Sequence, residues 1–354
     1  MIELKREHAT IVKEVQSKLI KSQGIPFGAS IFKQYSTNLM NYFQQCYFTP
    51  LSFKDQIQSQ QQARTVRSIR GTIKKKNLII RLTDKGNNFY IGSKVEFEKK
   101  VQQFFSETNA FIRLSYNPFH DILNRVIQLL NNLRTKKLIF QWQYNKMIPD
   151  KTKCELSHLY FNPKSRTQTI LIIFHFISFH CYCHSFQPSV PVRPIENTIH
   201  SSTTNISKFL DQLLRPIFDE KCKTTTIIDG SSLIQGLDQY LNRGTFNSST
   251  LFCTIDIRNL YTMLPQDLSL DILGEFLQTY GYTKIKNIDI QTIRELASIV
   301  LKENVFVYDK HIYQQTTGGA MDSSFTLTLA NIFMWKWQKE IVRQQDITGQ
   351  FYGR

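Results

Sequence analysis

The fold is decided by residues 251–265, which read Leu-Phe-Cys-Thr-Ile-Asp-Ile-Arg-Asn-Leu-Tyr-Thr-Met-Leu-Pro. The first five residues are apolar or β-branched, and this composition predicts a buried strand that ends at Asp256. Pro265 then begins a helical pattern, with Asp267 in the first turn, where a negative charge suits the helix dipole. A carboxylate at a strand end can hold Mg²⁺ beside a triphosphate. Taken alone, the pattern more often belongs to an ordinary strand-to-helix turn with a solvated aspartate.

Other short motifs accompany this stretch in a fixed order. They are Thr83-Asp84-Lys85-Gly86, Leu159-Tyr160-Phe161-Asn162-Pro163-Lys164, Val192-Arg193-Pro194-Ile195, Glu303-Asn304-Val305-Phe306 and Gly318-Gly319-Ala320-Met321. Together with Asp256, Leu260, Tyr261, Thr262 and Pro265, they resemble the reverse transcriptases of Penelope-like elements, a retroelement class related to telomerase. The resemblance covers about residues 75–354 and is specific because several motifs agree in order and spacing.

The resemblance implies an α+β fold with the fingers and part of the palm of a right-hand polymerase. In this architecture an antiparallel sheet is packed with helices. We expect a basic, mostly helical region over 1–77, an upstream region with the Asp-Lys-Gly element over 78–150, and the reverse transcriptase domain over 151–354. The implied activity is RNA-directed DNA synthesis, in which deoxynucleotides are added to a primer 3′-hydroxyl by two-metal phosphoryl transfer.

The resemblance also assigns residues to a nucleotide site. Asp256 is the expected catalytic carboxylate and Mg²⁺ ligand, helped by the carbonyl of Ile257. Lys164 and Arg193 are expected to bind the triphosphate, which suits the compact charge of lysine and the planar fork of arginine. The ring of Tyr261 is expected to exclude a ribose 2′-hydroxyl, and Met321 to support the nascent base pair. The simpler alternatives are surface cations at 164 and 193 and a packed core ring at 261.

The chain departs from the family pattern in three places. Asp322 stands where the family has a glycine, and it would be strained if that position requires a positive φ. An insert at 165–189 separates two motifs that relatives join by a short loop; we interpret it as translated non-coding sequence. The sequence ends at Arg354, where the family's Asp-Asp hairpin is expected, and it contains neither a thumb nor a GIY-YIG endonuclease domain. We therefore expect this chain to be inactive alone and to fold poorly.

The charge of the chain favours an anionic partner. The formal net charge is +16 and the pI is about 9.5, which point to nucleic acid, here an RNA template and a DNA primer. The most basic cluster consists of Arg64, Arg67, Arg70, Lys74, Lys75 and Lys76. On a helix the three arginines share one face, which suits a phosphate backbone, although a solvated basic face is the alternative.

The remaining features bear on location and on competing functions. The N-terminus lacks the apolar core of a signal peptide, and the scattered cysteines indicate reduced thiols in a nuclear or cytoplasmic protein that is not secreted. The apolar run 169–179 is too short for a confident membrane span. The spacing of His180, Cys181, Cys183 and His184 is not that of a usual zinc site. Two alternatives stay open, a non-catalytic nucleic-acid-binding remnant and, more weakly, a membrane-associated protein.

Hydrophobic periodicity predicts the remaining elements. A hairpin is expected around Asp309 and Lys310, and a helix that begins after Ser93. Further helices are expected over 118–133, 203–221, 229–242, 266–279, 288–303 and 323–344.

Overall fold

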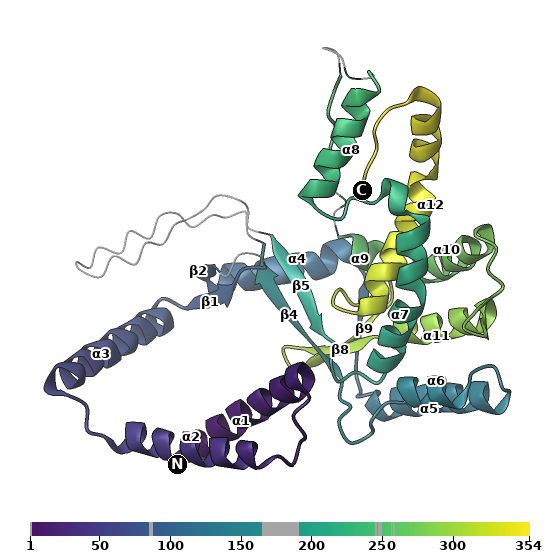
Figure 1. Ribbon diagram of the computed structural model, residues 1–354. Coiled ribbons are helices and arrows are strands. Elements are labelled where there is room, and N and C mark those ends of the chain that lie inside the picture. The colour runs from purple at the N-terminus through teal and green to yellow at the C-terminus, as the bar shows by residue number, and fades with distance from the viewer. Residues whose placement is uncertain are drawn as a thin grey trace. The chain divides into compact units, whose positions relative to one another are not determined.

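The computed structural model describes residues 2–84, 88–164, 191–244, 246, 250–255, 257 and 259–354. The chain forms two compact units, Met1–Lys76 and Asn77–Arg354 (Figure 1). The insert at 165–189, with its apolar run and its His and Cys residues, lies outside the described residues. So does Asp256, the predicted magnesium ligand.

The first unit is helical, as the sequence predicts. It contains α1 (Ile2–Gln23), α2 (Ser30–Phe48) and α3 (Phe53–Lys75). Helices α1 and α2 are joined by a hydrogen bond of 2.7 Å between the His8 ring and the carbonyl of Ser36, and Phe32 of α2 is buried. Ser52 caps the start of α3, where its hydroxyl accepts from the backbone N–H of Asp55, and no residue of this helix is buried. Its helicity therefore rests on local capping and propensity rather than on packing.

The second unit is built around a five-stranded sheet with the order β3-β9-β8-β4-β5. Its strands are β3 (Phe111–Leu114), β4 (Ser157–Pro163), β5 (Val192–Asn197), β8 (Val305–Tyr308) and β9 (His311–Gln315). β4 and β8 run parallel, and the other neighbouring pairs are antiparallel. β8 and β9 form the predicted hairpin, and Asp309 and Lys310 have positive φ values of 44° and 65°, as a two-residue type I′ turn requires.

An aromatic cluster packs between the sheet and the helix that precedes it. The antiparallel hairpin of β1 (Leu78–Leu82) and β2 (Phe89–Ser93) leads into α4 (Lys94–Thr108), and the Ser93 hydroxyl accepts from the backbone N–H of Glu96 at its start. The buried members of the cluster are Phe97, Val101, Phe104, Leu159, Phe161, Val192 and Phe306. They come from α4, β4, β5 and β8, so burial of this cluster fixes the helix on the sheet.

The larger hydrophobic core is formed mainly by helices. Its main helices are α5 (Phe119–Thr135), α6 (Gln141–Met147), α7 (Thr204–Lys221), α10 (Gln266–Thr279), α11 (Ile290–Lys302) and α12 (Ser324–Thr348). Shorter elements connect them: a 3₁₀ turn at Lys223–Thr225, α8 (Gly230–Asn242), α9 (Leu260–Met263), β6 (Lys284–Ile285) and β7 (Ile288–Asp289). Figure 1 shows α7 and α12 lying side by side, and the hydroxyls of Ser207 and Ser323 meet at 2.7 Å between them.

The observed fold is therefore α+β, and the expected helices are present within a few residues of their predicted bounds. Two predictions are wrong. The sheet is mixed and not wholly antiparallel, because β4 and β8 run parallel. The other is the strand expected to end at Asp256. Residues 250–255, which the structure describes, form neither strand nor helix, and Leu251, Phe252 and Ile255 are 86%, 70% and 74% exposed. A strand is stable only where another strand satisfies its backbone groups, and the apolar composition of this stretch does not supply that partner.

Candidate functional site

The candidate site starts at the paired ends of β4 and β5. Their antiparallel register places Asn162 opposite Arg193 and Tyr160 opposite Ile195, so Tyr160 and Arg193 project from the same face. The pairing continues past the strand, where the backbone N–H of Lys164 donates to the carbonyl of Pro191 at 2.8 Å. The two cations predicted to bind a triphosphate, Lys164 and Arg193, thus stand close together at one end of this ladder.

Arg193 is held by a residue to which the sequence assigned no chemistry. One terminal nitrogen of its guanidinium lies 3.2 Å from a carboxylate oxygen of Asp84, in the Asp-Lys-Gly element. The Asp84 side chain is 4% exposed and that of Arg193 is 32% exposed. The backbone N–H of Asp84 donates to the carbonyl of Pro163 at 3.0 Å, which ties the end of the β1–β2 hairpin to β4. Sequence spacing gave no signal for this ion pair, because its two residues are more than 100 positions apart.

The 260–264 turn and the 318–319 loop meet through their backbones. The N–H of Gly318 donates to Leu264 at 2.7 Å, and the N–H of Gly319 donates to Tyr261 at 2.9 Å. Gly318 has a φ of 78°, and a Cβ there would lie 2.0 Å from the carbonyl oxygen of Tyr261. A glycine is therefore required at 318 for two separate reasons, its φ and its close backbone contact.

Charges connect these two parts of the site. Burial raises the pKa of Tyr261, while the positive charges of Arg193 and Arg215 lower it. Burial also raises the pKa of Asp322, and Arg193 again acts in the opposite direction. Burial, and then the charge of Asp322, raise the pKa of Tyr160. Arg193 thus lies within electrostatic range of Tyr261 and Asp322, and Asp322 within range of Tyr160. Asp322 has no positive φ, so the strain considered for a side chain at this position does not arise.

A buried polar network includes Glu196, on the opposite face of β5 from Arg193. The amide nitrogen of Asn304 donates to Glu196 at 2.8 Å and to the Gln315 side chain at 2.7 Å. Burial raises the pKa of Glu196 to about 7, with a further rise from Asp322, although the hydrogen bond from Asn304 opposes the shift. The side-chain amide of Gln266 donates to three carbonyls, those of Leu301, Gln315 and Gly318, at 3.0–3.4 Å. The network therefore links β5, the 303–304 motif and the 318–319 loop.

We did not predict from the sequence that Glu196 is part of a buried network, although the burial pattern of its strand could have indicated it. In β5 the buried positions alternate, and Glu196 shares its inward phase with Val192 and Pro194. A charged residue in the inward phase of a strand requires a buried hydrogen-bond partner, which Asn304 supplies.

The other predicted site residues have different outcomes. Met321 is partly buried and adjoins Asp322, while Ile257 is 40% exposed. The six basic residues at 64–76 belong to the first unit, where Arg64, Arg67, Arg70, Lys74 and Lys75 lie on α3 and Lys76 follows it. Their helical placement is confirmed, and their binding to nucleic acid stays a prediction.

Carboxylates of the described residues do not gather in one cluster. Across that part of the chain, no group of three or more His, Cys, Asp or Glu side chains is placed to hold a metal ion together. Of the carboxylates described above, Asp84 is paired with Arg193, and Glu196 is buried with a raised pKa. Asp256, the expected ligand, is not among the described residues.

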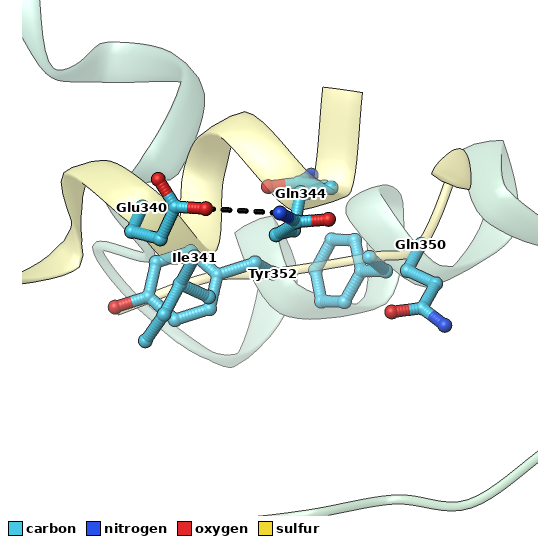
Figure 2. Close-up of a pocket in the computed structure, with 7 residues that line it drawn as sticks. Glu340, Ile341, Gln344, Gln350 and Tyr352 are labelled. Atoms are coloured by element: carbon cyan, nitrogen blue, oxygen red, sulfur yellow. Dashed lines mark hydrogen bonds between the residues drawn. The ribbon is translucent and has the colours of Figure 1, made fainter. Parts of the chain in front are cut away.

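A pocket of about 270 Å³ lies elsewhere, at the end of α12 (Figure 2). It is lined by Glu340, Ile341, Gln344, Gln345, Gln350, Phe351 and Tyr352, with Gln344 donating to Glu340 at 2.9 Å. None of the predicted site residues lines it. In the described ranges, none of the helices combines the length and the apolar character needed to span a membrane.

Comparison with known proteins assigns no family to the chain, since no protein-family model and no curated protein matches it.

Proposed function

We propose that this chain is part of a reverse transcriptase of the Penelope-like class, in a fingers-and-palm arrangement. Such an enzyme adds deoxynucleotides to a primer 3′-hydroxyl on an RNA template. The observation that carries the proposal is that three parts of the chain that are far apart in sequence lie near one another: the 318–319 loop donates to the backbone of Tyr261 and Leu264, and the charge of Arg193 acts on both Tyr261 and Asp322. Convergence of residues from several elements is what a nucleotide site requires.

The chemistry of these residues suits an incoming deoxynucleotide. The guanidinium of Arg193 retains donors beyond its contact with Asp84, and charge-assisted hydrogen bonds to phosphate are among the stronger ones. Lys164 adds a second positive charge at the same end of the β4–β5 ladder. The backbone of Tyr261 is held by the 318–319 loop, and its ring is partly buried; we propose that this ring occupies the space that a 2′-hydroxyl would need. We propose Asp256 and the carbonyl of Ile257 as ligands of the Mg²⁺ that accompanies the triphosphate.

The proposal is tested by nucleotide binding to the 354-residue chain. We expect dTTP to bind in the presence of Mg²⁺, and Arg193→Ala to weaken this binding about 10- to 100-fold, the loss for a hydrogen bond to a charged group. Primer–template binding should change little. Arg113→Ala, which removes an exposed arginine that contacts His311 on β9, is the matched control. An unchanged affinity for dTTP in Arg193→Ala would remove Arg193 from the site.

Sugar discrimination tests the role of Tyr261. We expect dTTP to bind more tightly than 5-methyl-UTP, which differs from it only by the 2′-hydroxyl, and Tyr261→Ala to bring the two affinities closer together by admitting that hydroxyl. A preference for dTTP that survives Tyr261→Ala would reduce Tyr261 to a packing residue.

A second candidate function is nucleic-acid binding without chemistry, and the surface of α3 favours it. This helix buries none of its residues and carries most of the basic cluster. Each phosphate that the cluster neutralises should contribute about −0.7 to −0.9 to the slope of log K against log salt. Replacing Arg64, Arg67 and Arg70 with Gln should make that slope shallower. Salt-dependent RNA binding in a chain that binds no dTTP would establish this candidate over the first.

A further inference from the structure

The Asp-Lys-Gly element has no assigned chemistry, yet the side chain of its aspartate is only 4% exposed. Thr83 donates its backbone N–H to Asn88 at 2.9 Å, which closes the chain between β1 and β2. The backbone N–H of Asp84 then donates to Pro163 at 3.0 Å, the last residue of β4. These two hydrogen bonds fix Asp84 at the end of the strand that leads to Lys164.

Burial makes the partner of this carboxylate important. An ionised group that is 4% exposed loses most of its hydration, and it stays charged at low cost only where a positive group replaces the water. Arg193 provides that charge at 3.2 Å. Removal of one member of such a pair leaves the other uncompensated, so the position of each side chain depends on the other.

Asp84 contacts only part of the Arg193 guanidinium. Its Nε is buried and has no hydrogen-bond partner within the described ranges, and one terminal nitrogen contacts Asp84. The side chain is nevertheless 32% exposed, so part of the planar fork remains open to a ligand. Because the fork is rigid, anchoring one terminal nitrogen also orients the other donors.

We propose that Asp84 is a positioning residue for phosphate binding by Arg193. It holds the guanidinium with its remaining donors directed toward the triphosphate, which lowers the entropy that binding must remove. This inference rests on the function proposed above, and it gives the Asp-Lys-Gly element a role in the nucleotide site. The negative charge of Asp84 also weakens the attraction of the positively charged Arg193 for phosphate. The gain from orienting the guanidinium must therefore be larger than this electrostatic loss.

Two probes separate phosphate recognition from recognition of the whole nucleotide. Inorganic tripolyphosphate tests the phosphate contacts alone, and dTTP with Mg²⁺ tests the complete ligand. We expect Asp84→Ala to weaken the binding of both probes about fivefold or more, within the range of coupling between neighbouring residues. Asp84→Asn keeps a hydrogen-bond acceptor of the same size and should lose less.

The decisive measurement is the same substitution in the Arg193→Ala background. If Asp84 acts through Arg193, Asp84→Ala has no further effect on either probe once Arg193 is removed. A general structural role would instead weaken binding equally in both backgrounds, and that result overturns the proposal. Tighter binding by Asp84→Ala also overturns it, because it would mean that charge neutralisation outweighs orientation.

Controls keep the result interpretable. Asp271→Ala breaks an ion pair with Arg294 between α10 and α11 and should leave the binding of both probes unchanged. If Asp84→Ala does not fold, Asp84→Asn carries the same comparison in both backgrounds. The two proposals fail differently. If Arg193→Ala does not change the affinity for dTTP, the nucleotide role of Arg193 is refuted. If Arg193→Ala weakens binding but Asp84→Ala does not, only the positioning role of Asp84 is refuted.

Discussion

Residues 251–255 and residues 259–265 are neighbours in sequence but differ in how the structure holds them. In the first segment Leu251, Phe252 and Ile255 are largely exposed, and no strand forms. The second segment is closed locally, where Thr262 donates its N–H to the carbonyl of Asn259 at 3.0 Å. It is also held by the 318–319 loop, which donates two backbone hydrogen bonds to it.

The difference shows which parts of a strand–turn–helix sequence can fold from local information. A turn and a short helix satisfy their backbone groups within a few residues. A strand cannot do so, because its partners are supplied by another segment. The second segment acquires its long-range contact through Gly318, whose missing side chain permits close backbone approach.

The largest effect is expected at Gly318. Gly318→Ala places a Cβ 2.0 Å from the Tyr261 carbonyl oxygen and 2.6 Å from the Cα of Thr262, at a φ of 78°. Left-handed backbone alone costs about 1–2 kcal/mol for alanine. With the backbone clash added, we expect a loss of about 4 kcal/mol or more in the free energy of unfolding, measured by urea denaturation.

Gly281→Ala is the matched control for this substitution. Gly281 has nearly the same φ, 77°, but nothing lies within 4 Å of the position of its Cβ. It should therefore show the cost of φ alone, about 1–2 kcal/mol. Equal losses of unfolding free energy from the two substitutions would mean that the 318–319 loop shifts to accommodate the added Cβ. Its contact with the 260–264 turn would then not be rigid.

The free energy of unfolding should depend on pH because of Glu196, in the buried network that adjoins the 318–319 loop. The pKa of buried Glu196 is about 7, above its ordinary value of 4.5, so between these values the folded protein keeps a proton that the unfolded chain releases. The free energy of unfolding should therefore fall as the pH rises from about 4.5 to about 7, by on the order of 2–3 kcal/mol. Glu196→Gln stays neutral and keeps an acceptor for Asn304, so this contribution should disappear.

Glu275→Gln provides the control, because Glu275 is a partly exposed carboxylate paired with Lys336. Its pH profile should follow that of the unmodified chain. If Glu196→Gln retains the full slope between pH 4.5 and 7, the titrating group lies elsewhere.

The sequence predicted those elements whose signals are local or periodic. The α+β class, the hairpin at Asp309 and Lys310, and the helix that begins after Ser93 follow from turn chemistry, capping and periodicity. The absence of a strand at 251–255 could not be predicted in this way. Apolar composition indicates that a segment prefers burial, but it does not show whether a neighbouring strand is available to pair with it. The pairing of Asp84 with Arg193 could not be predicted from the sequence either, because it depends on where the β1–β2 hairpin contacts β4.

A smaller effect is expected from Gln266, at the start of α10. Its side-chain amide donates to the carbonyls of Leu301, Gln315 and Gly318, so it helps to hold the turn and the loop together. Gln266→Ala should cost about 1–2 kcal/mol, because part-buried carbonyls lose their donors. Gln344→Ala, which removes an exposed amide that contacts Glu340, should cost less than about 0.5 kcal/mol in the same denaturation assay. Similar losses from the two substitutions would show that water replaces the Gln266 contacts.

The smallest effect on stability is expected in the exposed segment. Phe252 is 70% exposed and Leu251 is 86% exposed, so in the folded chain little of their apolar surface is removed from water. Because hydrophobic stabilisation scales with the apolar area that is buried, Leu251→Ser and Phe252→Ser together should change the free energy of unfolding by less than about 0.5 kcal/mol. The same substitutions should reduce self-association, since an exposed apolar stretch without strand partners favours contact between chains. Light scattering at increasing protein concentration measures this second effect. A large loss of stability, with scattering unchanged, would mean that 251–255 is packed in solution, as 259–265 is.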